Sequence, residues 1–154
     1  MRVSVFVGLL LLGPVAAFGQ DDDPKQLAQK ILDKGAALFA NKDAAAMAQT
    51  YTEDARVVAL TKENDSPHYK VDIREGRPAI KEMYADLYKT LNEPIKPRNR
   101  VEYAKRIAPD LLVIHGTFEL VEDQGDAYSF VQVRKQDGDT WRILSLQLFL
   151  IPKS

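Results

Sequence analysis

Apolar residues recur at helical spacing in three segments of the chain, and each segment is bounded by residues that start or stop helices. The first, residues 24–41, follows Asp23 and begins with a proline, which suits the first turn of a helix. The second, residues 44–50, is short and follows Asp43, a good capping residue. The third, residues 76–91, opens with Gly-Arg-Pro and is stopped by prolines. We therefore predict three helices.

The rest of the chain alternates between apolar and polar positions, which is typical of strands. A Gln-Asp-Gly-Asp segment at 136–139 is a strong signal for a tight hairpin. The strands are expected at residues 55–61, 68–74, 98–107, 111–121, 126–135 and 140–151. Helices come first and strands later, without β-α-β alternation. This order predicts an α+β domain with about six mostly antiparallel strands in a curved sheet and three helices on one face.

The first nineteen residues have the order of a cleavable signal peptide. A basic start at Met1-Arg2 precedes an apolar run at residues 3–12, a Gly-Pro breaker and small residues. The run is too short to span a bilayer, which needs about 20 apolar residues. Cleavage fits best after Gly19, with Ala17 as the alternative. We expect residues 1–19 to be removed and residues 20–154 to form one exported domain, periplasmic or secreted.

Composition narrows the choice of partners. The chain has 154 residues, a net charge of −1 and no cysteine. A nucleic acid or an anionic membrane would call for a basic face, so neither is expected as a partner. The absence of cysteine excludes disulfides, thiol catalysis and cysteine-ligated metals, so stability must come from an apolar core. The two histidines, His68 and His115, have no second ligand at metal-binding spacing, and we expect neither a metal nor another cofactor.

Three segments carry a resemblance to a known family. Residues 41–55 end in Tyr-Thr-Glu-Asp-Ala, residues 76–80 read Gly-Arg-Pro-Ala-Ile, and residues 137–143 read Asp-Gly-Asp-Thr-Trp-Arg-Ile. Together with the element order, they resemble the SnoaL-like branch of the nuclear-transport-factor-two-like superfamily. The resemblance implies a cone-shaped half-barrel, a pocket in its concave face and a homodimer formed through the outer face of the sheet. It does not imply one activity, because the superfamily hosts enzymes, binding modules and assembly domains.

Candidate catalytic groups are few. The carboxylate base of isomerase-like members of the superfamily would fall on Ala59, whose methyl group cannot move a proton. Asp54 and His115 are the remaining candidates for acid–base chemistry. For Asp54 we favour a structural role at the turn into the first strand. His115 alternates with Ile114 and Gly116, which lie on the apolar face of their strand, so we expect it on the outer face.

The expected ligand site is the concave face of the sheet. Its floor would combine Ile114, Gly116 and Phe118 with Ser129, Val131 and Val133, if the smaller face of that strand points inward. Gly116 either makes room for a ligand or relieves strain in a bent strand. The ligand-binding candidates are Tyr51, Tyr84, Tyr103, Gly116, Phe118, Ser129 and Gln147.

Three functions fit this pattern. The first is non-catalytic binding of a small apolar molecule by an exported homodimer. The second is an isomerase, cyclase or lyase that moves a proton in the same pocket. The third is an oligomerisation domain whose cavity is filled by its own side chains. A large cavity would favour ligand binding over a purely oligomerising domain. A base positioned in the pocket would favour the enzyme over the binding protein.

Overall fold

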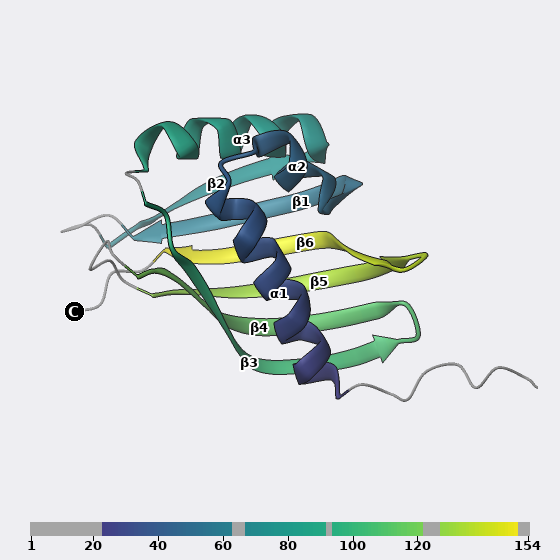
Figure 1. Cartoon of the computed structure of the whole chain (residues 1–154). Coiled ribbons are helices and arrows are strands. Elements are labelled where there is room, and N and C mark those ends of the chain that lie inside the picture. The colour runs from purple at the N-terminus through teal and green to yellow at the C-terminus, as the bar shows by residue number, and fades with distance from the viewer. Residues whose placement is uncertain (1–22, 63–66, 92–93, 122–126, 151–154) are drawn as a thin grey trace, which may run out of the picture.

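The computed structural model describes residues 23–62, 67–91, 94–121 and 127–150 (Figure 1). The predicted leader, residues 1–19, lies outside the described residues. No helix in the described ranges is both long and apolar enough to cross a bilayer. The elements are α1 (Pro24–Ala40), α2 (Ala44–Gln49), β1 (Tyr51–Lys62), β2 (Tyr69–Glu75), α3 (Gly76–Thr90), β3 (Pro97–Ala108), β4 (Leu111–Leu120), β5 (Tyr128–Asp137) and β6 (Thr140–Leu150).

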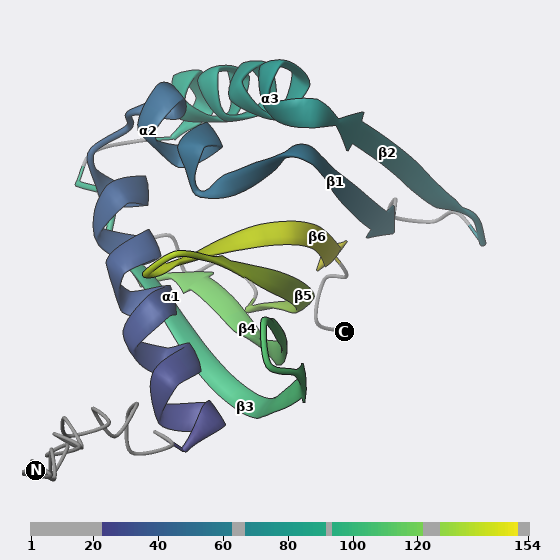
Figure 2. The same ribbon diagram turned by 90° about the vertical axis from the view of Figure 1, so that its right-hand side faces the viewer.

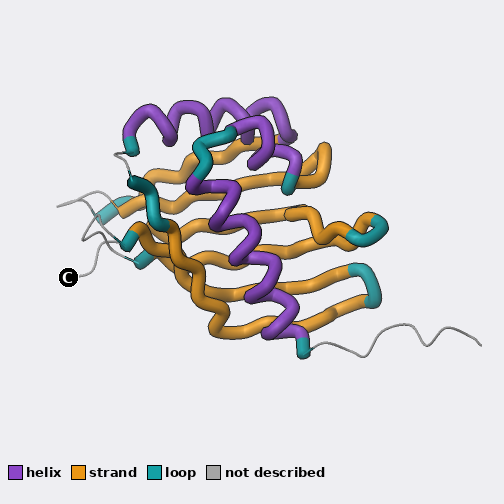
Figure 3. The backbone as a smooth tube through the Cα atoms, viewed as in Figure 1, coloured by secondary structure: helices purple, strands orange, loops and turns teal. Residues whose placement is uncertain are grey.

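The six strands form one curved, open sheet in the order β2-β1-β6-β5-β4-β3. All neighbours are antiparallel except β1 and β6, which run parallel. All three helices lie on one side of the sheet (Figures 1, 2 and 3). The predicted α+β architecture is confirmed. The strand predictions are correct within a few residues, although β1 begins at Tyr51, four residues earlier than expected.

Local chemistry explains where the helices begin. Asp43 caps α2 by accepting a hydrogen bond from the backbone N–H of Ala46 at 2.9 Å. Pro24 occupies the first turn of α1 as predicted, but the side chain of Asp23 makes no capping hydrogen bond. Gly76 begins α3 with φ +79°, a backbone conformation that suits glycine.

Helix α1 is fixed to the edge strand β3 by a glutamine side chain. Gln29 donates to the carbonyl oxygen of Asn99 at 3.0 Å and accepts from the N–H of Val101 at 3.0 Å. A strand edge otherwise presents unpaired backbone groups, so these two bonds also protect it. The apolar core fills the space between the helices and the sheet. Its buried members include Leu32, Phe39, Tyr51, Val57, Ile80, Tyr84, Tyr88, Leu112, Ile114, Phe130, Ile143 and Leu146.

Four irregularities interrupt the pairing of the described strands, one of them between Arg106 and Ala108 near the end of β3. Residues 52–55 of β1 lie opposite the single residue Leu144 of β6, because Tyr51 pairs with Ile143 and the next paired residue of β1 is Arg56. Leu144 is also the extra residue between β6 and β5. In β3 the pairing shifts at residue 102. Each bulge changes which side chains face the helices beyond that point.

Candidate functional site

Three tyrosines form a buried cluster between the sheet and the helices. Tyr51 is the first residue of β1, and Tyr84 and Tyr88 lie one turn apart on the inner side of α3. The hydroxyl groups of Tyr51 and Tyr84 are 2.7 Å apart and share a hydrogen bond. Phe39 of α1 packs edge-on against Tyr84 and Tyr88, with ring centroids 6.2 and 5.2 Å apart. The predicted inward position of Tyr51 and Tyr84 is confirmed.

Burial keeps these phenols in their neutral, hydrogen-bonding form. Burial raises the pKa of Tyr51 to about 12. The hydrogen bond with Tyr84 and the nearby charge of Arg134 lower this pKa, but by less than burial raises it. Burial also raises the pKa of Tyr84 well above its usual range and raises that of Tyr88. The Tyr88 hydroxyl is buried, and no described residue forms a hydrogen bond with it.

An arginine lies on the inner face close to the tyrosines. Arg134 of β5 is only 5% exposed. Its Nε donates to Oε1 of Gln132 at 2.9 Å, and its Nη1 donates to the backbone oxygen of Trp141 at 3.0 Å. Burial lowers the pKa of Arg134 to about 10, so the guanidinium still carries its charge at neutral pH. Neither Arg134 nor Gln132 was predicted to lie on the inner face, because charged and amide side chains are usually exposed to solvent.

The prediction that the smaller face of β5 points inward is wrong. Phe130, Gln132 and Arg134 are the buried residues of this strand, and Phe130 pairs with Gly116. Ser129, together with Val131 and Val133, therefore lies on the outer face. The two-residue turn at 138–139 was the signal for this register. It pairs Gln136 with Trp141, so these two residues lie on the same face of the sheet. Because Trp141 is on the inner face, alternation along β5 places the even-numbered residues of this strand on the inner face too.

Bulges explain two further corrections. Tyr103 should share the inner face with Val101, but the shift at residue 102 pairs it with His115 and leaves it 52% exposed. Gln147 should share a face with Ile143, but the extra residue Leu144 turns it outward, where it is exposed. The expectation that Tyr103, Ser129 and Gln147 point into the cavity is therefore wrong.

Gly116 does not open a space on the inner face. A Cβ atom at this position would lie 2.3 Å from the backbone oxygen of Arg100 and 3.0 Å from the ring of Phe130. Phe118, two residues along β4, packs edge-on against Phe39 with the ring centroids 5.4 Å apart. The contacts of Gly116 show a close approach of β3 and Phe130, which is neither of the two interpretations drawn from the sequence, and they leave no room for a ligand beside it.

The acid–base candidates lie away from the interior. His115 is on the outer face as predicted, with Nδ1 3.6 Å from a carboxylate oxygen of Glu102. Ala59 lies on the inner face, where its neighbours across the sheet are Asp72 and Leu148. No group of three or more potential metal ligands of the His, Cys, Asp or Glu type occurs among the described residues.

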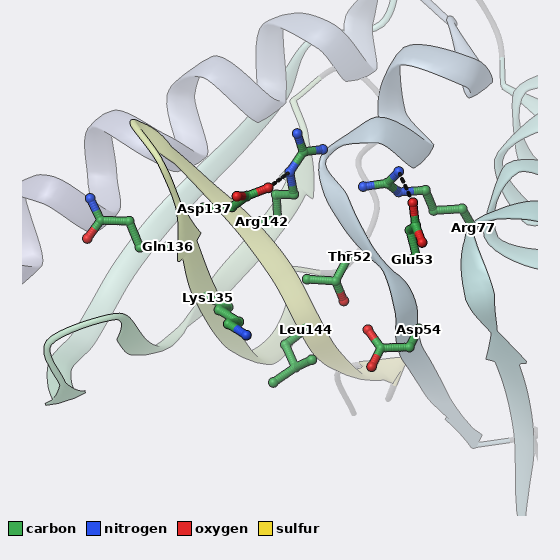
Figure 4. Close-up of a pocket in the computed structure, with 9 residues that line it drawn as sticks. All are labelled: Thr52, Glu53, Asp54, Arg77, Lys135, Gln136, Asp137, Arg142 and Leu144. Atoms are coloured by element: carbon green, nitrogen blue, oxygen red, sulfur yellow. Dashed lines mark hydrogen bonds and ion pairs between the residues drawn. The ribbon is translucent and has the colours of Figure 1, made fainter.

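Asp54 lines a hollow where β1 bulges away from β6 (Figure 4). The hollow has a volume of about 400 Å³. Its charges are balanced, and four of them form two ion pairs, Arg77 with Glu53 at 3.8 Å and Arg142 with Asp137 at 3.3 Å. The remaining lining residues are Thr52, Lys135, Gln136 and Leu144. Both arginines also donate to backbone oxygens, Arg77 to Tyr51 at 2.8 Å and Arg142 to Gln49 at 2.7 Å, so each is already held by the protein itself.

Comparison with solved structures identifies the fold. An NTF-2 like protein of unknown function from Shewanella oneidensis MR-1 superposes with a TM-score of 0.64 at 13% identity, over 82% of this chain and 99% of that chain. The chain adopts the NTF2-like fold. No protein-family model and no curated protein matches the sequence.

Two further structures with this fold have names that point to different roles. A putative calcium/calmodulin-dependent protein kinase II association domain from Xanthomonas campestris has a TM-score of 0.61 at 20% identity, over 87% of this chain and 91% of that chain. A ketosteroid isomerase-like protein from Erwinia carotovora atroseptica has a TM-score of 0.52 at 13% identity, over 79% of this chain and 94% of that chain. At these identities the NTF2-like fold is shared, and function has to be argued from the site.

Proposed function

We propose that the protein binds a small molecule between the sheet and the helices of the NTF2-like fold and does not transform it. The observation that carries this proposal is the cluster of buried phenol hydroxyls beside Arg134 in a largely apolar interior. The hydroxyls of Tyr51 and Tyr84 share a hydrogen bond, while that of Tyr88 has no partner within the described ranges. An apolar site with a few convergent polar groups is the usual form of a small-molecule pocket.

Binding without turnover is favoured because none of the candidate acid–base residues lies between the sheet and the helices in the described part of the chain. Ala59 replaces the base that the superfamily resemblance would require. Asp54 and His115 lie on the outer side of the sheet. The tyrosines have raised pKa values, so they donate hydrogen bonds but give up protons reluctantly.

The test is native mass spectrometry of the exported protein purified without added ligand, followed by extraction and identification of what it carries. We expect one small molecule for each chain. Tyr84→Phe should lower its occupancy, whereas the matched change Tyr103→Phe on the outer face should leave occupancy unchanged. A protein that carries nothing, and whose melting temperature no member of a small-molecule library raises, would contradict the proposal.

Self-association is a second proposed role, supported by the outer face of the sheet. In the described part of the chain, no helix covers this face (Figure 2). Tyr69, Val71 and Ile73 of β2 are large apolar side chains, 45–54% exposed. Val131 and Val133 of β5 share the same face. Burial of such a surface stabilises association by about 25 cal/mol per Å² of apolar area before the cost of docking.

A second copy of the chain is the proposed occupant of this face, since its apolar side chains lie beside the ion pair of Arg98 with Glu119, which neutralises two charges of β3 and β4. Sedimentation should give a dimer at micromolar concentration. Val131→Asp should give a folded monomer, and Lys89→Asp on α3 should remain dimeric. A wild-type monomer at that concentration would refute the assembly.

Export and membership of the SnoaL-like branch are also part of the proposal. The charge, apolar run and small residues of segment 1–19 support export, and the three motif segments support the branch. Fractionation of cells that express the full chain tests the first point, because the protein should appear outside the cytoplasm in a shortened form.

A further inference from the structure

The hollow between β1 and β6 has the size of a small-molecule site. It exists because residues 52–55 of β1 lie opposite the single residue Leu144 of β6, so the two strands separate there. Its volume of about 400 Å³ falls within the range of about 300–1,000 Å³ that is usual for ligand pockets. What the hollow could bind therefore depends on the groups in its walls.

Two charges of opposite sign remain once the arginines are accounted for. Four of the six charged residues that line the hollow form the two arginine ion pairs, and the other two are Asp54 of β1 and Lys135 of β5. Each is adjacent in sequence to a buried inner residue, Ala55 and Arg134, so alternation places both on the outer face. Figure 4 shows their carboxylate and ammonium groups pointing towards each other from opposite sides of Leu144.

The spacing of the strands leaves room between these two charges. Strand β6 lies between β1 and β5, so the backbones that carry Asp54 and Lys135 are about 10 Å apart. The surface between them is the side chain of Leu144. The walls therefore present an acceptor for a cation on one side, a donor for an anion on the other, and an apolar contact in the middle.

A third polar group belongs to the wall formed by β1. The hydroxyl oxygen of Thr52 is buried, and no described residue forms a hydrogen bond with it. Thr52 lies two residues before Asp54, so both side chains project to the same side of the strand. Buried hydroxyls are rarely left without a hydrogen bond, so this one indicates a partner from outside the described residues.

We propose that this hollow binds a free α-amino acid with an apolar side chain. The ammonium group of the ligand pairs with Asp54, its carboxylate pairs with Lys135, and its side chain contacts Leu144. A zwitterion suits the site because a ligand with one charge would satisfy only one of the two walls. The hollow is separate from the buried tyrosine cluster, so this inference does not depend on the proposed interior site.

The binding test compares L-leucine with two compounds that each lack one of its charges. 4-Methylpentanoate has no ammonium group, and leucinamide has no carboxylate. Isothermal titration with the full-length protein at about pH 6.5 keeps the amines protonated. Wild type should bind L-leucine about tenfold more tightly than either compound, the effect of losing the hydrogen bonds of one charged group. Similar affinities for all three compounds, or no binding of L-leucine, would overturn the inference.

Two variants assign the two ends of the ligand. Asp54→Asn should bind L-leucine and 4-methylpentanoate equally within about twofold and still prefer L-leucine to leucinamide. Lys135→Gln should show the reverse pattern. The matched controls Glu82→Gln and Lys81→Gln, on the exposed side of α3, should keep both preferences. A preference that survives in the variant meant to remove it would overturn the inference.

The position of the ligand is tested in wild type by nuclear magnetic resonance. Addition of L-leucine should shift the backbone amide signals of Thr52 and Asp54 and the methyl signals of Leu144, and leave the ring signals of Tyr84 in the core unchanged. Shifts at Tyr84 without shifts at Leu144 would place the amino acid in the interior and overturn the inference. The proposed interior function is judged separately, by the molecule that the native protein carries.

Discussion

Replacement of Gly116 by alanine tests whether the floor of the concave face is packed or open. The added Cβ would lie 2.3 Å from the backbone oxygen of Arg100, about 1 Å inside an ordinary C···O contact of about 3.3 Å. Rotation of a side chain cannot relieve this overlap, because the oxygen belongs to the backbone of β3. Strand β3 must move away and weaken its pairing with β4.

The magnitude follows from two contributions. Overpacking of a core costs about 1–3 kcal/mol, and one weakened backbone hydrogen bond adds about 1 kcal/mol. We therefore expect Gly116→Ala to lower the free energy of unfolding by about 3 kcal/mol, or the melting temperature by about 10 °C. Gly35→Ala is the matched control. A Cβ there meets nothing within 4 Å, and alanine should stabilise α1 by about 0.5–1 kcal/mol.

The assay is urea unfolding of both variants and of wild type, followed by circular dichroism at constant pH. Gly116→Ala should be less stable than wild type and Gly35→Ala more stable. The free energies of unfolding of the two variants should therefore differ by about 4 kcal/mol. A loss below about 1 kcal/mol for Gly116→Ala would refute the packing argument. It would mean that the space above this residue is open, and Gly116 would return as a candidate floor of a ligand pocket.

Four further outcomes are expected. Tyr51→Phe and Tyr84→Phe should each destabilise the fold by about 1–2 kcal/mol, and the double variant should cost less than their sum, because each single change leaves one buried hydroxyl without its partner; a urea double-mutant cycle measures this. Since burial raises the pKa values of Tyr51, Tyr84 and Tyr88, their ionisation at 295 nm should accompany alkaline unfolding rather than precede it, and Tyr88→Phe should reduce that step. His115→Ala should fold and retain ligand occupancy in native mass spectra; a hundredfold loss of function would favour the enzyme hypothesis. The exported protein should begin at Gln20 in N-terminal sequencing, and an exported form beginning at residue 1 would contradict the leader.

The fold could be predicted because its signals are local. Helical spacing and capping residues gave the three helices, and the register of β4 followed from simple alternation. Leu112 and Ile114 are fully buried while His115 is on the other face. No bulge interrupts the pairing of β4 with β5, so alternation remained valid along the whole strand.

The site could be predicted only in part, because its residues depend on long-range register. Two bulges turn Tyr103 and Gln147 outward, and a bulge leaves no clear mark in a single sequence. Arg134 was missed for another reason. Its guanidinium is tolerated inside because Gln132 and a backbone oxygen accept its hydrogen bonds, and those partners are visible only once the strands are paired.

The same irregularities explain why the polar cluster lies where it does. The pairing of β6 is disturbed towards both neighbours at Leu144, immediately after Ile143, whose partners are Tyr51 and Arg134. A bulge increases local twist and bends the strand, so the inner side chains on either side of Ile143 converge more than in a flat sheet. Beside the bulge of β3 at residue 102, by contrast, Gly116 lets Phe130 and β3 approach closely. The irregularity at Leu144 therefore lies next to the part of the inner face that carries the hydroxyl of Tyr51 and the charge of Arg134.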